Sequence, residues 1–398
     1  MIDIDIQQKN HQAEKRLFDT LLSYHLEEGH AISVWQLPQT SKKHIMVGRQ
    51  GVQALTEVTL EELGQGFIMS PFDSVKSKFF IPANETYVVE NGECSSIPTS
   101  PMEITQTVKG NTQLPSPLPF HLPKHPGKGE VDKQEYLALV AKVLQHIKQG
   151  KLEKLVPARN KRIVLPPHFD LTQTFLHLCA AYPNAFVSLV SSPETGTWLG
   201  ASPELLVSLQ GDRLFKTVAV AGTQPHQPHT NLKAVAWTEK EIEEQALVSR
   251  YIINCFKKIR LREFEEHGPK TWRAGDLLHL KTDFEVDRVA TNFPQLGSVM
   301  LQLLHPTSAV CGMPREASIQ FIRENESFDR QFYSGYLGPV NYQNESHVYV
   351  NLRCLQWANQ EATLFAGAGV TLDSTPEKEW EETELKLNSL LKVIYSKP

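Results

Sequence analysis

Long apolar runs are missing from the sequence. No stretch approaches the ~18 consecutive apolar residues that a membrane-spanning helix needs, and the opening MIDIDIQQKN lacks the basic start and apolar core of a secretory signal. We therefore expect a cytoplasmic protein with no membrane partner.

Cysteine is scarce, and neither sign of charge predominates. The five cysteines are odd in number and lack the paired spacing of a zinc site; they are Cys94, Cys179, Cys255, Cys311 and Cys354. This pattern predicts reduced thiols and no disulfides, as is usual in the cytosol. The net charge of −5 and the pI near 6.3 provide no basic surface for a nucleic-acid partner.

Several catalytic signatures are absent as well. The dinucleotide pattern Gly-x-Gly-x-x-Gly does not occur, no serine stands in a nucleophile elbow, and Cys311 has no cysteine-protease signature around it. The sequence therefore indicates neither a nucleotide cofactor nor covalent catalysis.

The composition, with 40% hydrophobic side chains in 398 residues, is typical of a globular chain. Apolar residues at helical spacing predict helices at 13–29, 133–150, 238–259 and 376–395. β-Branched and aromatic residues predict strands at 31–37, 155–165, 185–191, 197–202, 204–209, 214–222, 347–357 and 362–370. Because the strands arrive in runs and do not alternate with helices, we predict an α+β fold.

A proline-dense segment, 113–130, divides the chain. Proline lacks a backbone donor and disfavours helices and central strands, so this segment is predicted to be a linker or a surface strap. Before it, residues 1–112 are predicted to be a scaffold within the same fold. After it, residues 131–398 hold the candidate chemistry.

Two acidic doublets at i, i+3 spacing are the first candidates. Glu241 with Glu244, and Glu379 with Glu382, would each place two carboxylates on one helix face. Two such helices brought together would form an all-oxygen site for Mg²⁺. Taken alone, such doublets are more often solvated surface, and neither has the Glu-x-x-His spacing of a di-iron bundle.

The segment FAGAGV, residues 365–370, is the second candidate. Its small residues would let a ligand carboxylate approach the backbone amides, although a tight turn without a ligand is equally consistent with so short a motif. Further polar residues carry no weight singly, because each is more often a surface, capping or core residue. These residues are Lys154, Glu204, Thr223, His279, His305, Tyr333 and Arg353.

Taken in order, these segments resemble the chorismate-utilising enzymes of menaquinone, siderophore and tryptophan synthesis. The resemblance rests on KLVPAR (154–159), GASPELL (200–206), AGT (221–223), EKEIEE (239–244), LLHL (277–280), HPTSAVCGMP (305–314), YSGYLG (333–338), LRC (352–354), AGAGV (366–370) and EKEWEETELK (377–386). The motifs lie after Val131, and the N-terminal third carries none. The resemblance implies large, mostly antiparallel sheets packed as a sandwich with flanking helices.

Three positions resemble the isochorismate synthases within this family. A lysine at the position of Lys154 is found in members that use water and not ammonia. Ala221 stands where aminodeoxychorismate synthases carry a lysine, and His305 begins a motif that salicylate-forming members begin with phenylalanine. The chain has no glutaminase domain to supply ammonia, so we expect a monomer without a glutaminase subunit.

The resemblance implies that Lys154 is the general base on the water that attacks C2 of chorismate. Glu204 would protonate the hydroxyl that leaves C4. The metal Mg²⁺ would be held by Glu241, Glu244, Glu379 and Glu382. The positions that resemble substrate-binding ones are Thr223, His279, Tyr333, Arg353, Gly367 and Lys386.

Some positions depart from the family pattern. Gln245 replaces a usual histidine, Gln224-Pro225-His226 replaces a segment that usually begins with arginine, and Pro157 predicts a bulge or an edge strand. The alternatives are a salicylate synthase, which would also eliminate pyruvate, and a catalytically silent chorismate-binding subunit. We expect a role in menaquinone synthesis, with siderophore synthesis as the alternative.

Overall fold

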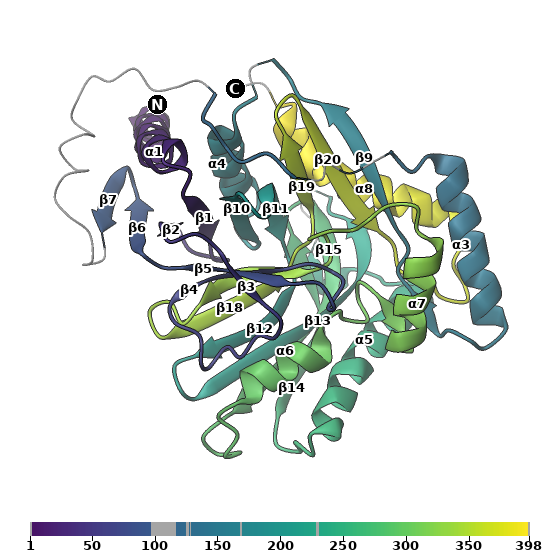
Figure 1. Cartoon of the computed structure of the whole chain (residues 1–398). Coiled ribbons are helices and arrows are strands. Elements are labelled where there is room, and N and C mark those ends of the chain that lie inside the picture. Colours follow the sequence, from purple (N-terminus) through teal and green to yellow (C-terminus); the bar gives the residue numbers. More distant parts are fainter. Residues whose placement is uncertain are drawn as a thin grey trace.

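A computed structural model describes residues 2–96, 117–124, 127, 129–167, 169–227 and 231–396. Two nine-stranded antiparallel sheets form its centre (Figure 1). The first sheet has the order β7 (Glu93–Ser96), β6 (Glu85–Glu90), β2 (Lys43–Gly48), β1 (Ala31–Gln36), β10 (Phe186–Ser192), β11 (Gly196–Ser202), β19 (Cys354–Ala358), β20 (Glu361–Gly367) and β9 (Ala158–Val164). The second has the order β14 (Glu265–Ala274), β15 (Leu277–Asp287), β13 (Leu214–Pro225), β12 (Leu205–Gln210), β18 (Glu345–Val350), β17 (Tyr336–Val340), β4 (Gly66–Ser70), β5 (Lys78–Pro82) and β3 (Gln53–Leu55).

Helices cover the outer faces of both sheets. The first sheet is covered by α1 (Ile2–Glu27), α4 (Leu171–Ala181) and α8 (Pro376–Ile394). The second is covered by α5 (Glu239–Lys258) and α6 (Leu296–Leu304). Beside them, α3 (Lys133–Lys148) and α7 (Arg315–Asn325) pack around the short ladder of β8 (Lys154–Leu155) and β16 (Gly312–Met313). The predicted α+β sandwich with flanking helices is confirmed.

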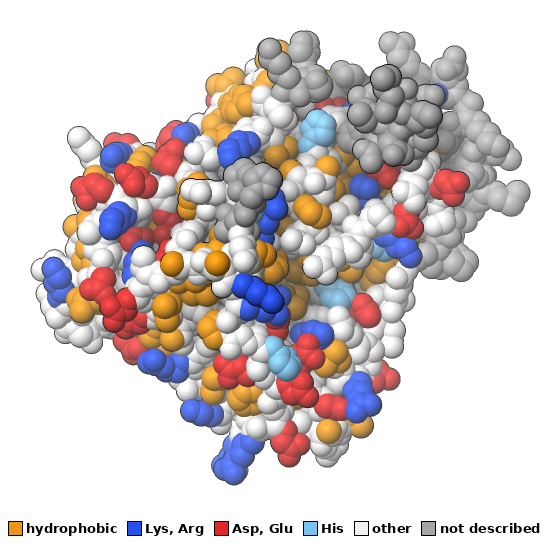
Figure 2. Space-filling model, turned by 180° about the vertical axis from the view of Figure 1, so that it is seen from behind, with side chains coloured by type: hydrophobic (Ala, Val, Ile, Leu, Met, Phe, Trp, Pro, Cys, Tyr) orange, Lys and Arg blue, Asp and Glu red, His pale blue; other side chains and the backbone are white. Residues whose placement is uncertain are grey.

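The surface mixes charges of both signs. Figure 2 shows acidic and basic side chains interspersed over the face opposite to the view of Figure 1. Within the described ranges, no helix is long and apolar enough to cross a bilayer.

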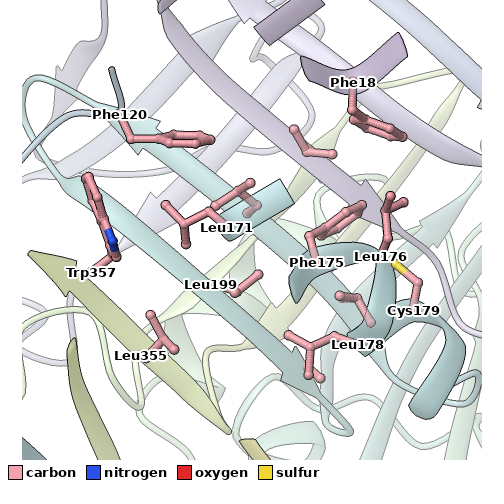
Figure 3. Close-up of a cluster of buried hydrophobic side chains, with 14 of the residues drawn as sticks. Phe18, Phe120, Leu171, Phe175, Leu176, Leu178, Cys179, Leu199, Leu355 and Trp357 are labelled. Carbon is pink, nitrogen blue, oxygen red and sulfur yellow. The ribbon is translucent and has the colours of Figure 1, made fainter. Parts of the chain in front are cut away.

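The outer core shows why α4 forms and where it packs. The Asp170 side chain accepts a hydrogen bond from the backbone amide of Gln173 and so caps the helix. The apolar residues that follow pack against α1 and the first sheet (Figure 3). Phe175 is fully buried there, with its ring centroid 5.9 Å from that of Phe18.

A second apolar layer lies between the two sheets. It is largely aromatic, with Trp198 stacked on Phe365 at 5.5 Å and Phe186 stacked on Tyr349 at 4.3 Å. These side chains come from both sheets and fix how the sheets face each other.

The predicted strand 347–357 is wrong as one element. It divides into β18 and β19, which belong to different sheets. At the crossing Arg353 has φ 46°, a left-handed conformation that costs a non-glycine residue roughly 1–3 kcal/mol. The chain therefore changes sheets where Arg353 stands.

The predicted strand 155–165 is interrupted at Pro157, as the sequence indicated. Pro157 lies between β8 and β9, and β9 is an edge strand of the first sheet. The helix predicted at 13–29 begins earlier, at Ile2. The hairpin of β14 and β15 and the helices α4, α6 and α7 were not predicted.

Strands from the N-terminal region lie in both sheets beside strands from the C-terminal region. Of the proline-dense segment, residues 117–124 lie on the first sheet. Phe120 is buried against Trp357, and the His121 backbone amide donates to Ser191 Oγ at 3.0 Å. Residues 113–116, 125, 126 and 128 lie outside the described residues.

We expect Phe175→Ala to lower the free energy of unfolding by about 3–5 kcal/mol, because it opens a cavity in this core. Val164→Ala at the exposed edge of the first sheet is the control, and its effect should stay within about 0.5 kcal/mol. Guanidinium unfolding followed by circular dichroism measures both. Equal effects of the two changes would contradict the assignment of Phe175 to the core.

Candidate active site

A pocket opens between the two sheets and is bordered by α5 and α8. Its walls come from the ends of β11, β13, β15, β19 and β20 and from the loop after α6. Most of the predicted site residues line it, namely Glu204, Thr223, Glu244, His279, Tyr333, Arg353, Gly367, Glu382 and Lys386. Segments more than 200 residues apart in the chain are therefore assembled at one place.

Glu204 is a buried carboxyl group whose pKa lies near neutral pH. It follows β11, and burial raises its pKa from 4.5 to about 7. Thr307 Oγ1 donates a hydrogen bond to Glu204 Oε1 at 3.2 Å, which opposes that rise, as do the charges of Lys154 and Lys386. The residue is poised to give up a proton at physiological pH.

Lys154 is fully buried on β8 and does not itself line the pocket, but it pairs with Glu244, which does. Its Nζ lies 2.9 Å from Glu244 Oε1 in an ion pair, but makes no hydrogen bond of good geometry within the described ranges. Burial by itself would raise the pKa of Glu244. The ammonium groups of Lys154 and Lys240 have the larger combined effect, so the pKa of Glu244 is lowered overall. The pKa of Glu244 is therefore lowered whereas that of Glu204 is raised.

Arg353 and His279 form one buried pair on the far wall. His279 Nδ1 donates to the Gly222 carbonyl at 2.6 Å, which leaves Nε2 to accept from Arg353 Nη2 at 2.5 Å. Burial and the Arg353 charge hold the pKa of His279 well below 6.5, so the ring is neutral. Burial lowers the pKa of Arg353 to about 10, so the guanidinium keeps its charge at neutral pH. The bulge in β13 after Ala221 places Gly222 and the half-buried Thr223 beside this pair.

The glycines of FAGAGV make room for site side chains. A Cβ at Gly369 would lie 2.1 Å from Glu244 Oε1, and one at Gly367 would lie 3.2 Å from the Tyr333 hydroxyl. The Gly367 carbonyl accepts a hydrogen bond from Lys386 Nζ at 2.9 Å. The motif thus lets charged and polar groups approach the backbone, and it is more than a turn.

Lysines neutralise the carboxylates of α5 and α8. Lys154 pairs with Glu244 at 2.9 Å, Lys240 with Glu379 at 2.6 Å and Lys386 with Glu382 at 2.8 Å. The charges of Glu382 and Glu244 also act on the Lys240 ammonium and help to raise its pKa. These three carboxylates therefore surround one region of positive charge.

The donor set fits a hard divalent cation. All three groups offer oxygen, and Glu379 Oε2 is buried without a hydrogen-bond partner in the described part of the chain. Burial, with the neighbouring Glu382, raises the pKa of Glu379 to about 7, although the Lys240 ammonium opposes the rise. Among the described residues, no three His, Cys, Asp or Glu side chains converge as a ready-made metal cage.

Glu241 is placed differently from the other glutamates. Its Oε2 accepts hydrogen bonds from the Thr238 amide at 2.8 Å, the Thr238 hydroxyl at 2.9 Å and Gln224 Nε2 at 3.0 Å. It closes a capping box at the start of α5 and does not line the pocket. Gln224, a departure from the family pattern, is thus tied to this cap.

Two contributors were missed as site residues in the sequence. Thr307 belongs to the HPT segment, which was used only to choose among relatives, and Lys240 stands inside the first acidic motif. His305, by contrast, turns away from the pocket and donates to the Pro71 carbonyl at 3.2 Å. The other departure, Gln245, donates to the Ala219 carbonyl and to Thr282 Oγ1, and so ties α5 to the second sheet.

Comparison with known proteins agrees with this arrangement. The family model for chorismate binding enzymes matches residues 81–395. The chain belongs to the chorismate binding enzyme family. It is an enzyme, and the resemblance predicted from its motifs is confirmed.

Two curated relatives of this chorismate binding enzyme are both named as isochorismate synthases. The vibriobactin-specific isochorismate synthase of Vibrio cholerae is 29% identical over 281 residues, which cover 69% of this chain and 70% of that protein. The isochorismate synthase EntC of Escherichia coli is 32% identical over 264 residues, which cover 64% of this chain and 66% of EntC.

Solved structures share the fold. MenF, the menaquinone-specific isochorismate synthase of Escherichia coli, superposes with a TM-score of 0.72 at 22% identity, over 94% of this chain and 91% of MenF. Anthranilate synthase component I of Streptococcus pneumoniae gives 0.66 at 17% identity, over 90% of this chain and 89% of that one. The chorismate binding fold thus extends over the described sheets.

We expect Thr307→Val to raise the pKa of Glu204 above about 7, because the hydroxyl that favours the ionised carboxylate is lost. Infrared difference spectra against Glu204→Gln, recorded across pH, follow this carboxyl group. Ser308→Ala is the control, since that buried hydroxyl has no hydrogen-bond partner in the described ranges. A lower or unchanged pKa in Thr307→Val would contradict the assigned hydrogen bond.

Proposed function

We propose that this chain is an isochorismate synthase, which adds water at C2 of chorismate and expels the C4 hydroxyl. The observation that carries the proposal is the pairing of a buried carboxyl group in the pocket wall, Glu204, whose pKa is raised to about 7, with the buried Lys154, which contacts Glu244 of the same pocket. The names of the curated relatives support the same reaction.

The proton transfers balance between these two residues. Lys154, once its ammonium group has released a proton to solvent, takes a proton from the attacking water, and the new C–O bond forms at C2 as the two ring double bonds shift toward C4. Protonated Glu204 gives its proton to the departing hydroxyl, which leaves as water. Lys154 then carries an added proton and a positive charge, Glu204 is left as a carboxylate, and proton exchange with solvent restores both.

The two carboxylates of chorismate require positive charge and hydrogen-bond donors. Arg353 is held in place by His279 and by the Ala274 carbonyl, which accepts from Nη1 at 3.3 Å, so its fork is pre-organised for a carboxylate. Lys386, Tyr333 and the backbone at Gly367 lie on the same side of the pocket. We assign these groups to substrate binding, with Thr223 beside the ring.

We assign Mg²⁺ to the oxygens of Glu244, Glu379 and Glu382, with Glu241 holding the start of α5. When bound, the ion would act as a Lewis acid toward a substrate carboxylate and template its position. The chain's own lysines prepare this site, since Lys240 and Lys386 neutralise Glu379 and Glu382.

The proposal concerns the chemical step that menaquinone and siderophore synthesis share. The named relatives include a vibriobactin-specific enzyme and a menaquinone-specific one. We propose a monomeric cytoplasmic enzyme, with menaquinone synthesis as the pathway expected from the sequence.

Purified protein incubated with chorismate and Mg²⁺ in ¹⁸O-water should form isochorismate labelled at C2, as read by chromatography with mass spectrometry. Turnover should fall as the pH rises through about 7, because Glu204 then loses the proton it must donate. Formation of salicylate and pyruvate would show that the product is salicylate and not isochorismate. Recovery of unchanged chorismate would overturn the proposed function.

We expect Lys154→Ala to lower kcat by about 10²–10⁴-fold, the usual contribution of a general base. Chorismate binding, measured by calorimetry, should stay within a few-fold because Arg353 and Lys386 remain. Lys151→Ala, an exposed lysine of the same segment, is the matched control. Turnover near the wild-type rate in Lys154→Ala would rule out the assigned base.

We expect Lys240→Met to bind Mg²⁺ several-fold more tightly, because the ammonium that competes for Glu379 is gone. Calorimetric titration with MgCl₂, without chorismate, measures this affinity directly. Lys378→Met removes the same charge from an exposed position next to Glu379 and is the control. Weaker binding in Lys240→Met than in the control would contradict the metal site assigned to these carboxylates.

A further inference from the structure

A buried arginine behind the pocket joins two of its walls. Arg330 is almost inaccessible to solvent, and Phe72 packs on its guanidinium face at 4.4 Å. Its Nη1 donates to the Val310 carbonyl at 2.9 Å and its Nη2 to the Val156 carbonyl at 2.7 Å. Both valines line the pocket, whereas Arg330 itself does not.

Each of these carbonyls belongs to a segment with a proposed catalytic role. Val156 stands two residues after Lys154, and Val310 stands three residues after Thr307, which donates to Glu204. One planar group therefore connects the strand of the proposed base with the loop that holds the proposed acid. A backbone hydrogen bond from the Val156 amide to the Cys311 carbonyl, at 2.9 Å, runs parallel to this link.

Glu326 completes the connection. Its Oε1 accepts a hydrogen bond from Arg330 Nη2 and its Oε2 accepts one from Arg330 Nε at 2.8 Å. The Oε1 atom also accepts a hydrogen bond from the Ala158 amide at 2.8 Å. Pro157 interrupts the backbone ladder at this point because it has no amide hydrogen. The Glu326 carboxylate thus fixes the chain on the far side of that interruption.

Stability alone does not account for such a pair. A buried ion pair is often no more stabilising than apolar residues of the same volume, and Phe72 already provides an apolar neighbour. What apolar residues cannot replace is the simultaneous hydrogen bonding to two carbonyls and one amide.

We propose that Arg330 and Glu326 are positioning residues that hold Lys154 and Glu204 at their working separation. This proposal rests on the proposed function. Neither residue touches the substrate. They act through the backbone at Val156, Ala158 and Val310.

Arg330→Lys is the sharpest test, since lysine keeps the charge but cannot reach both carbonyls in the plane of the fork. We expect kcat to fall by about 10–100-fold, because a displacement of about 1 Å can cost that much. KM for chorismate should change less than about threefold, because Arg353 and Lys386 are untouched. Amide hydrogen exchange should rise in peptides covering 154–158 and 307–311.

Two further variants make the result decisive. Arg323→Lys on α7 is the matched control, as Arg323 pairs with Asp73 at 2.7 Å on the surface, and it should change neither kcat nor exchange. Glu326→Gln keeps an acceptor for the Ala158 amide but loses the charge, and should give the same effects in weaker form. If Arg330→Lys fails to fold by circular dichroism, Glu326→Gln decides.

Wild-type kcat and unchanged exchange in a folded variant would overturn the proposal, and so would equal losses in kcat and in chorismate affinity. Exchange is measured without substrate. An inactive wild-type protein would therefore overturn the proposed function and still leave the exchange comparison to judge the positioning pair.

Discussion

Buried carboxylates that lie close together repel one another, and the rest of this site depends on how that repulsion is relieved. Three glutamates from α5 and α8 face one region, and each has a lysine ammonium within 3 Å: Lys154, Lys240 and Lys386. In a desolvated site an unpaired carboxylate is costly, and the lysines remove most of that cost.

The pairing also separates the behaviour of two glutamates that are buried alike. Glu244 contacts Lys154 and is ionised, whereas the Glu204 carboxyl group, within the described part of the chain, receives a side-chain hydrogen bond from Thr307 alone and has a pKa of about 7. Burial acts on both in the same direction, so the partner decides the outcome. A single pocket thereby holds a carboxylate with a lowered pKa and a carboxyl group with a raised one.

The backbone irregularities of the fold lie where this chemistry is placed. The chain crosses between the sheets at Arg353, β13 carries a bulge at Gly222, and Pro157 breaks the strand that follows Lys154. In regular strands every second side chain would point into the inter-sheet core, which is filled with aromatic rings. The irregularities at Arg353 and Gly222 place Arg353 and Thr223 in the pocket lining, and buried contacts such as that of Glu326 with the Ala158 amide hold the chain beyond the break at Pro157.

The sequence by itself determined the fold class, the family and the residue types of the site, because these follow from periodicity and from ordered motifs. Helices with strong apolar spacing, such as Lys133–Lys148, and the edge position implied by Pro157 were predictable from local rules. The division of 347–357 between two sheets was not, since both halves have the same strand-like pattern and only packing separates them. Likewise, the spacing of Glu241 and Glu244 is identical in kind to that of Glu379 and Glu382. Only the tertiary structure decided that Glu241 caps a helix, because this depends on which way the first turn of α5 faces. Only the tertiary structure decided that Lys240 pairs with Glu379 and that Arg330 joins the pocket walls at Val156 and Val310, because these contacts bring together segments that lie far apart in the chain.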